Sequence, residues 1–322
     1  MKSKKNKEIK NKKKISKFSK IIIIILLISV VITLSIVVLA KIGYFNNDWK
    51  LLKTDRKVYT SSVPSYVPIG FKYVEGTINT GYVIEDEKGN QFVLVPVDGD
   101  KIKLERKNFD KVLGQIKEND CKDEGLDEFL QSVNDNKGFY VARYEAGNEG
   151  GIFTLKGDFV SSIDGGILVS KKDVNAWTNV SDSDAKTMAQ GMYNYSKVSV
   201  HSDLINSYAW DTICNWLSDV ANINNKNIAY INDSTGMGNY TNLSTLYNTV
   251  VSKTGSNVSY KVKNIYDLAG NVGEISTEKI TSDNTTIIRG GLYTLTGNIS
   301  VASRLKYSEK NDLCGFRVIL YK

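Results

Sequence analysis

The chain has 322 residues and a formal net charge of +7, with one histidine and three cysteines. Ten lysines and one glutamate within the first 20 residues give that segment a charge of +9, so the remaining chain carries −2. The basic residues are not interleaved with aromatic ones, which argues against nucleic-acid binding. Three cysteines are too few for a fold built on disulfides.

Residues 21–40 form an apolar segment without a charged side chain, interrupted only by Ser29, Thr33 and Ser35. A helix of this length spans about 30 Å, the thickness of the hydrocarbon layer of a membrane. We expect a single-pass anchor, with the lysine-rich residues 1–20 in the cytoplasm and the rest of the chain outside the cell. The Val-Leu-Ala sequence before Lys41 leaves open a second interpretation, a cleaved signal peptide.

Residues 41–62 are polar and mixed, which is typical of a spacer, and residues 63–322 are expected to form one extracellular domain. Residues 81–97 predict a β-hairpin around the turn Asp-Glu-Lys-Gly-Asn, with Pro96 at a strand end or sheet edge. Residues 138–147 predict a third strand because aromatic and β-branched side chains precede a glycine.

Two helices are expected next, over residues 181–196 behind Ser and Asp caps and over residues 201–220 with Ser202 as the cap. Residues 221–262 show no sustained period and predict loops and short strands. Three short β-segments follow, at 285–295, 299–307 and 315–322. Strands, two helices and then strands again predict an α+β fold.

Five segments, in order along the chain, resemble motifs of one known family. They are GFYVARYEAG at 138–147, SDLINSYAWDTICNWLS at 202–218, NIYDLAGNVGEIS at 264–276, IIRGG at 287–291 and GFRVIL at 315–320. Together they resemble the formylglycine-generating-enzyme, or sulfatase-modifying-factor, family, and in particular a bacterial surface branch of it. The resemblance implies that family's variant of the C-type lectin fold.

The resemblance also implies a structural calcium site in the loop 264–276. Its ligands would be the side chains of Asp267 and Glu274 and the carbonyl groups of Gly270 and Val272. Oxygen donors of this kind suit calcium, and a glycine lets carbonyl groups converge in a tight turn. Position 273 is glycine where the family usually has tryptophan. The alternative is that both carboxylates only terminate turns.

Catalysis in the family requires a pair of cysteines that binds copper between the R-G-G and G-F-R motifs, and the thiolate preference of copper(I) explains this need. Residues 292–313 contain no cysteine, so we expect neither copper nor the family's reaction. The related iron enzymes need several histidines, and His201 is the only one. Arg289 and Arg317 resemble scaffold residues that pair with carboxylates.

The C-type lectin resemblance also implies a disulfide between Cys214 and Cys314, which would stabilise an extracellular domain. The other interpretation of these two residues is a pair of buried free thiols. Cys121 lies in a charged stretch and is expected to be exposed and unpaired.

The sequence therefore favours a membrane-anchored bacterial surface protein with a non-catalytic binding domain. The segment between the R-G-G and G-F-R motifs is the expected binding surface, and a protein, peptide or glycan would fit it equally. The side chains expected to contact the ligand are Tyr293, Asn298, Arg304 and Tyr307. The alternatives are an enzyme with altered chemistry in the same pocket and a structural component of the envelope.

Overall fold

The computed structural model describes residues 56–58, 65–109, 116–156, 159–194, 198–219, 228–241 and 250–322. The chain divides into the units Met1–Lys50 and Leu51–Lys322, and all described residues belong to the second. The expected tail at 1–20, the anchor at 21–40 and most of the spacer at 41–62 lie outside the described residues. No helix among the residues described is both long and apolar enough to cross a membrane.

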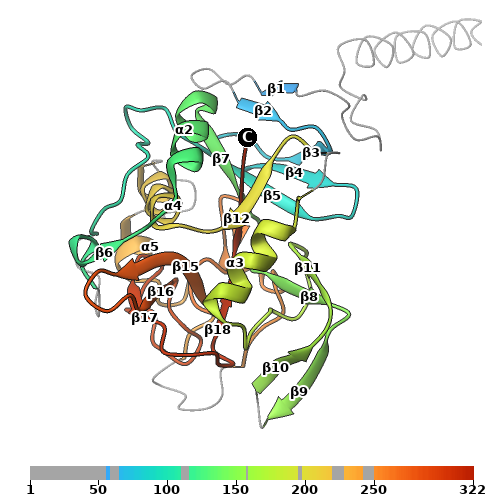
Figure 1. The fold of residues 1–322 in the computed structure, drawn as a ribbon, viewed down its shortest axis with the longest axis vertical. Coiled ribbons are helices and arrows are strands. Elements are labelled where there is room, and N and C mark those ends of the chain that lie inside the picture. Colours follow the sequence, from blue (N-terminus) through green and yellow to red (C-terminus); the bar gives the residue numbers. More distant parts are fainter. Residues whose placement is uncertain are drawn as a thin grey trace, which may run out of the picture. The chain divides into compact units, whose positions relative to one another are not determined.

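The centre of the domain is a six-stranded sheet in which every neighbouring pair is antiparallel. Its strands, in spatial order, are β12 (His201–Leu204), β19 (Val318–Tyr321), β7 (Gly138–Ala142), β5 (Gln91–Pro96), β4 (Tyr82–Asp86) and β3 (Phe71–Glu75). The C-terminal strand β19 therefore lies inside the sheet, between β12 and β7, a strand from the first half of the chain (Figure 1).

The predicted hairpin at 81–97 is confirmed as β4 and β5, which pair from Tyr82 with Leu94 to Glu85 with Gln91. Pro96 is the last residue of β5 and lies opposite Gly138. A proline fits there because the ladder ends and no further N–H group is required.

A second sheet is mixed and contains β17 (Arg304–Lys306), β16 (Thr286–Arg289), β15 (Gly273–Ile280) and β18 (Cys314–Phe316), in that order. The strand β6 (Cys121–Lys122) also pairs with β15. The pairing of β15 with β18 is parallel, and the other pairings are antiparallel. Because β15 begins at Gly273, this sheet holds the end of the loop that resembles a calcium site.

Four small two-stranded units complete the β-structure. They are β1 (Arg56–Val58) with β2 (Ser65–Val67), β8 (Gly147–Glu149) with β11 (Ile167–Val169), β9 (Ile152–Lys156) with β10 (Phe159–Asp164), and β13 (Lys261–Val262) with β14 (Ile265–Tyr266). The β9–β10 hairpin extends away from the central sheet (Figure 1). Only part of the strand predicted at 138–147 forms, because β7 ends at Ala142.

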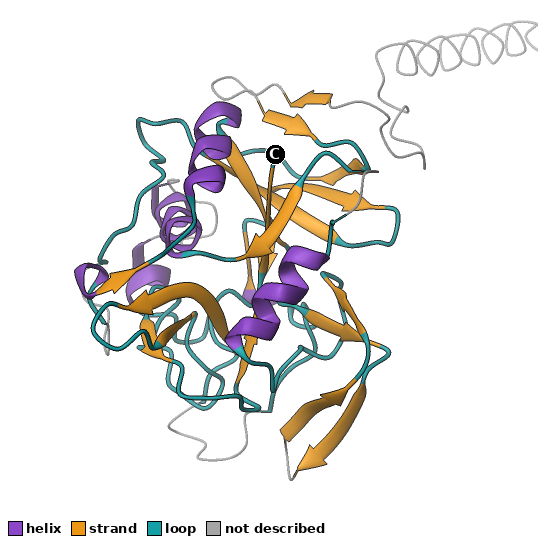
Figure 2. Ribbon diagram, viewed as in Figure 1, coloured by secondary structure: helices purple, strands orange, loops and turns teal. Residues whose placement is uncertain are grey.

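The helices are few and short, which makes the described part of the chain a mixed fold with more strand than helix (Figure 2). They are α2 (Asp127–Asn136), α3 (Asp182–Gly191), α4 (Ser207–Asp219) and α5 (Ile228–Asn232), with 3-10 turns at Glu118–Asp120 and Val258–Tyr260. The sequence pattern did not predict α2 or α5.

The predicted helix at 181–196 is confirmed in its first part as α3, which ends at Gly191, and its cap is Ser181, whose hydroxyl accepts a bond from the Asp184 N–H. The helix predicted at 201–220 is partly wrong, since His201–Leu204 is strand β12. The cap of α4 is Asn206, whose Oδ1 accepts from the Ala209 N–H at 2.8 Å. Ser202 instead accepts a bond from the Tyr193 N–H at 3.0 Å.

The two faces of the central sheet bury two different cores, because successive strand side chains point to opposite faces. Val93 and Val141 belong to the first core, together with side chains of α2, α4 and α5. Leu94 and Tyr140 belong to the second core, which includes side chains of α3, β15, β16 and β18. The second sheet is therefore attached to the central sheet through the core that also contains α3.

Candidate functional site

The loop 264–276 has an unusual backbone, with left-handed φ angles at Asn264, Asp267, Gly270 and Asn271 of 63°, 53°, 75° and 59°. Asparagine, aspartate and glycine are the residues that tolerate this conformation best. At Gly270 a Cβ atom would also lie 2.4 Å from the Asn239 carbonyl oxygen, so only glycine fits. The shape of the loop therefore requires residues of these types at these positions.

Glu274, one of the expected calcium ligands, is instead bound by Arg317. The Arg317 Nε donates to Glu274 Oε1 at 3.0 Å and to Oε2 at 2.8 Å, and Nη2 donates to Oε1. The guanidinium also donates to the carbonyl groups of Ala142 and Tyr266. Both partners are fully buried. Arg317 thus has the scaffold role that the resemblance implied for it.

Two further buried carboxylates lie beside this pair. The Asp267 Oδ2 accepts from the Gly255 N–H at 2.6 Å. Glu145 accepts from the Val272 N–H at 3.2 Å and from the Asn271 side-chain amide at 2.5 Å. The sequence analysis missed Glu145, although its segment was one of the five that resemble the family.

The three carboxylates share a single guanidinium, so the cluster of Glu145, Asp267, Glu274 and Arg317 has a formal charge of −2. Burial raises the pKa of Asp267 to about 6. Burial, followed by the charges of Asp267 and Glu274, raises the pKa of Glu145 well above its ordinary value. Burial also raises the pKa of Glu274, and the charge of Arg317 opposes that rise. The one positive charge of Arg317 is therefore too little to balance the three carboxylates.

The donor set is compatible with a hard cation at part of the expected site. Asp267 and Glu145 supply oxygen donors and unbalanced negative charge, both of which calcium prefers. Glu274 is a poorer candidate because both of its oxygens accept bonds from the positively charged Arg317, whereas the oxygens of Glu145 accept bonds from neutral N–H groups. In the described part of the chain, no group of three or more His, Cys, Asp or Glu side chains is arranged to hold a metal ion.

Arg304, expected to face a ligand, is completely buried. Its Nε donates to Glu278 at 2.9 Å and its Nη2 donates to Asp211. The expectation was wrong about the direction of this side chain, because Arg304 lies opposite Arg289 in the β16–β17 ladder and both point to the same interior. Arg289 donates to Asp211 at 2.7 Å, which confirms its expected pairing with a carboxylate.

The other three residues of the expected binding surface differ in exposure. Tyr293 and Tyr307 retain only 2% and 7% of their accessible surface. The Tyr307 hydroxyl donates to the Val180 carbonyl at 2.7 Å. Asn298 is exposed, and its side chain accepts a bond from the Thr296 hydroxyl. These residues do not form one continuous surface.

A polar cleft of about 510 Å³ lies on the domain surface beside Tyr307. It is lined by residues 181–182, 285–286 and 306–310. The start of α3, the turn before β16 and the loop after β17 thus meet around one opening. The last of these segments belongs to the interval between the R-G-G and G-F-R motifs. The sequence analysis named only Tyr307 of this set, because nothing local connects the three segments.

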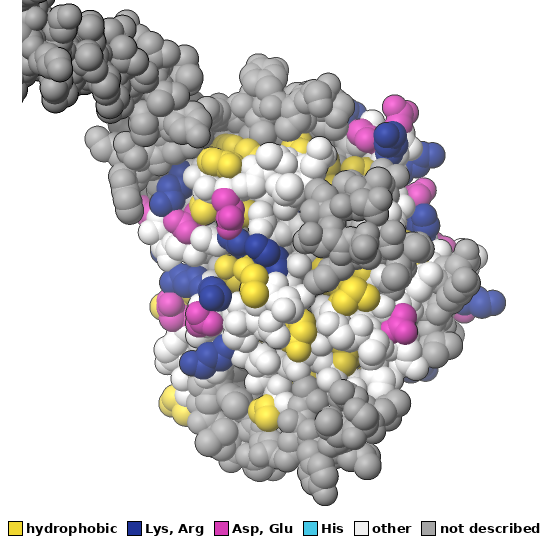
Figure 3. Space-filling view, turned by 180° about the vertical axis from the view of Figure 1, so that it is seen from behind, with side chains coloured by type: hydrophobic (Ala, Val, Ile, Leu, Met, Phe, Trp, Pro, Cys, Tyr) yellow, Lys and Arg dark blue, Asp and Glu magenta, His cyan; other side chains and the backbone are white. Residues whose placement is uncertain are grey.

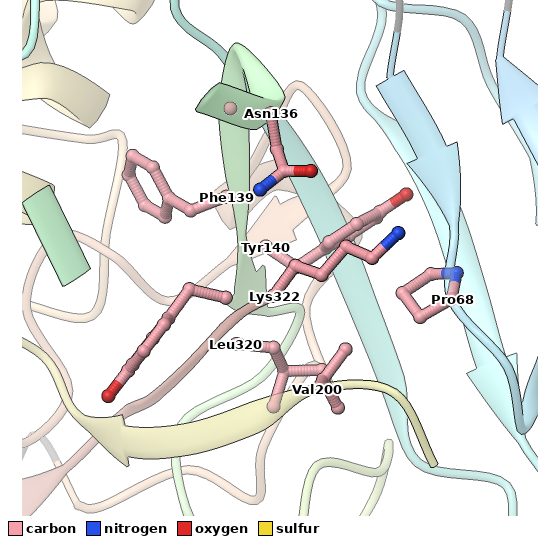
Figure 4. A pocket seen from close by; sticks show the side chains of 9 residues that line it. Pro68, Asn136, Phe139, Tyr140, Val200, Leu320 and Lys322 are labelled. Atoms are coloured by element: carbon pink, nitrogen blue, oxygen red, sulfur yellow. The ribbon is translucent and has the colours of Figure 1, made fainter. Parts of the chain in front are cut away.

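A second pocket lies at the C-terminal end of β19 and is much smaller, at about 30 Å³. Figure 4 shows that Tyr140 of β7, Leu320 of β19 and Val200, which precedes β12, approach it and that Pro68 lies at one side. This volume holds about one or two water molecules. We therefore do not regard it as a ligand site.

All three cysteines are free and buried. Burial raises the pKa of Cys121 to about 11 and those of Cys214 and Cys314 to about 12. Cys214 lies in the core that contains α4 and Cys314 in the core that contains α3, so the structure shows two separate thiols. Cys121 is only 5% exposed, which corrects the expectation of an exposed thiol.

No protein-family model and no curated protein matches this chain. Among solved structures, the crystal structure of CarF is similar, with a TM-score of 0.37 and 16% sequence identity. The match covers 58% of this chain and 87% of CarF. Similarity at this level carries no argument about fold or function.

Proposed function

We propose that this chain is a membrane-anchored bacterial surface protein whose domain binds a ligand without catalysis. In this proposal the domain has the formylglycine-generating-enzyme-like variant of the C-type lectin fold. The convergence of the family-like motifs supports it. Glu145, Glu274 and Arg317 come from three different motifs and lie in one buried cluster. Asp211 and Arg289 come from the other two and form an ion pair.

The chemistry of the cysteines supports a non-catalytic role. Nucleophilic and copper-binding cysteines act as thiolates. The three thiols of this chain are buried, with pKa values raised to about 11 or 12, so they stay protonated at neutral pH. They also lie on three different strands or helices, β6, α4 and β18.

The observation that carries the binding proposal is the open polar cleft formed in part by residues 306–310. Its volume of about 510 Å³ lies within the range of about 300–1,000 Å³ that is usual for small-molecule sites. Charged side chains of both signs are interspersed on the rear face of the molecule, and its hydrophobic side chains occur in separate groups (Figure 3). A specific cleft therefore explains binding better than a broad apolar patch.

Calcium is part of this proposal. A divalent cation beside Asp267 and Glu145 would balance the formal charge of −2 in the buried cluster. It would stabilise the loop 264–276 and take no part in a reaction.

Residues 21–40 would anchor the domain to the cell membrane, with residues 1–20 in the cytoplasm.

The binding proposal is tested with the purified full chain, applied to immobilised glycans, peptides and cell-surface proteins. We expect saturable binding to one of these classes. A Ser308→Trp substitution should weaken that binding, because Ser308 is an exposed residue of the cleft. Ser256→Trp is a matched control at another exposed serine outside the cleft. Binding to none of the three classes would contradict the proposal.

The rival enzymatic function has its own experiment. The full chain is incubated with copper, oxygen and a cysteine-containing peptide, and the peptide is analysed by mass spectrometry. We expect the cysteine to remain unchanged. Conversion of the cysteine to an aldehyde would contradict the non-catalytic proposal.

A further inference from the structure

The floor of the cleft is held by a network of bonds between two distant segments. Asp182, the first residue of α3, accepts a bond from the Thr286 hydroxyl at 2.6 Å. The same carboxylate oxygen accepts from the Lys279 ammonium at 2.9 Å. Thr286 is 5% exposed, so this part of the cleft is fixed by the fold.

The outer wall is fixed at two points and exposed between them. The Tyr307 N–H donates to the Thr286 carbonyl at 2.8 Å, and the Tyr307 hydroxyl donates to Val180 at 2.7 Å. Further along, the Asn311 carbonyl accepts from the Asn179 N–H at 2.9 Å. Residues 308–310 lie between these points and form an exposed rim. The cleft is thus preformed, which lowers the entropic cost of binding.

The lining of the cleft is polar and electrically balanced. Five of its residues carry hydroxyl groups, namely Ser181, Thr285, Thr286, Tyr307 and Ser308. Asp182 pairs with Lys279 and Lys306 pairs with Asp283, and the rim adds one charge of each sign through Glu309 and Lys310. No residue of the lining set has an aliphatic side chain.

This lining discriminates between classes of ligand. Because the charges balance, neither an anion nor a cation gains a net attraction. The exposed carbon atoms of the lining belong to side chains that also carry polar groups, so a purely apolar ligand would leave those groups without hydrogen-bond partners. A neutral molecule with many hydroxyl groups fits better, since each hydroxyl both donates and accepts hydrogen bonds. Closely spaced hydroxyl and carboxylate groups on the protein complement such a ligand.

We propose that the cleft between α3, the turn before β16 and the loop after β17 binds a neutral carbohydrate. This inference rests on the proposed function and names its ligand class. It places the binding site at Asp182, Thr286 and the rim 308–310. Of the residues selected from the sequence, only Tyr307 belongs to it.

The experiment measures binding of the full chain, kept in a polyoxyethylene detergent that contains no sugar, to immobilised oligosaccharides. One set is neutral, built from hexoses and N-acetylhexosamines, and a second set carries sulfate groups on the same chains. We expect saturable binding to a neutral oligosaccharide. Its affinity should be the same at low and high salt, because salt screens interactions between exposed charges and a neutral ligand makes none.

The variants test whether the ligand binds in the cleft or elsewhere on the surface. Ser308→Trp and Glu309→Trp both place a large ring at the exposed rim and should weaken binding by about tenfold or more. Ser256→Trp should leave it unchanged. Lys310→Glu keeps a polar side chain at the rim and should weaken neutral binding less than either tryptophan substitution does, since a neutral ligand does not depend on the sign of that charge. Unchanged melting temperatures confirm that each variant is folded.

The outcomes distinguish this inference from the proposed function. If the chain binds only sulfated oligosaccharides and Lys310→Glu abolishes that binding, the inference of a neutral ligand is wrong. The proposed function, a ligand-binding domain, is then retained. Neutral binding that survives both tryptophan substitutions overturns the cleft as the site. Binding to peptides or proteins alone overturns the carbohydrate inference and retains the proposed function. The absence of saturable binding to every probe contradicts both.

Discussion

Arg289 and Arg304 face each other across the β16–β17 ladder, and both are bound by the same two acids, Asp211 and Glu278. The two guanidinium groups would repel one another in a buried position without these carboxylates between them. Arg106 adds a third guanidinium at 3.2 Å from Glu278. The network joins α4 to the second sheet, so it determines how that sheet is attached.

We predict that Asp211→Asn destabilises the domain by about 3–5 kcal/mol, because two buried guanidinium groups then lose a charged partner. Denaturant unfolding of the variant and of the unchanged chain measures this difference. Lys306→Gln, on the same strand as Arg304 but 59% exposed at its side chain, is the control and should have an effect below about 0.5 kcal/mol. An Asp211→Asn variant as stable as the parent would show that the network contributes little.

We predict strong coupling between Glu274 and Arg317. Glu274→Gln and Arg317→Met should each cost about 3–5 kcal/mol, because each leaves a buried charge without its partner. The double variant should cost clearly less than the sum of the two. The free energies of unfolding of the parent, the two single variants and the double variant give the coupling energy of the pair in a double-mutant cycle. Strict additivity would mean that the two residues do not act as a pair.

We predict that calcium raises the melting temperature of the full chain and that a chelator reverses the effect. At a calcium concentration of about 100 times the dissociation constant, binding stabilises a protein by about 2.7 kcal/mol. Asp267→Asn should abolish the response, whereas Glu309→Gln, an exposed acid outside the cluster, should retain it. Identical melting of the parent with calcium and with chelator would remove calcium from the proposal.

We predict that none of the three thiols reacts with a disulfide reagent at pH 8 in the native protein. Their pKa values of about 11 to 12 leave little thiolate, and burial blocks access. All three should react after denaturation without a reducing agent. The reaction of only one thiol after denaturation would instead support a bond between Cys214 and Cys314.

We predict that Asn206→Ala destabilises the domain by about 1 kcal/mol, because the N-terminus of α4 loses its side-chain cap. Asn206→Asp should retain most of the stability, since a carboxylate caps equally well. Thermal unfolding compares the two variants. If the alanine and aspartate variants melt together, the side chain of Asn206 does not act as a cap.

Much of the local structure could be predicted from the sequence because it depends on neighbouring residues. Two β-runs around a polar turn predicted the β4–β5 hairpin, and Ser181 before a periodic segment predicted α3. The same reasoning misplaced the start of α4, since Ser202 was expected to cap the helix but residues 201–204 pair with β19. Strand pairing with a distant partner prevailed over the local pattern.

The candidate sites also contain some features that the sequence determined and others that only the tertiary structure decided. The sequence alone indicated a tight turn within residues 264–276, because glycine permits one, and it determined that residues 292–313 hold no thiol. Only the tertiary structure decided that Arg317 pairs with Glu274, that Glu145 bonds to Asn271 at a separation of 126 positions, and that Arg304 is buried. It also formed the cleft from three separate segments. Ion pairs and clefts depend on which distant residues meet, and that is determined by the packing of the two sheets.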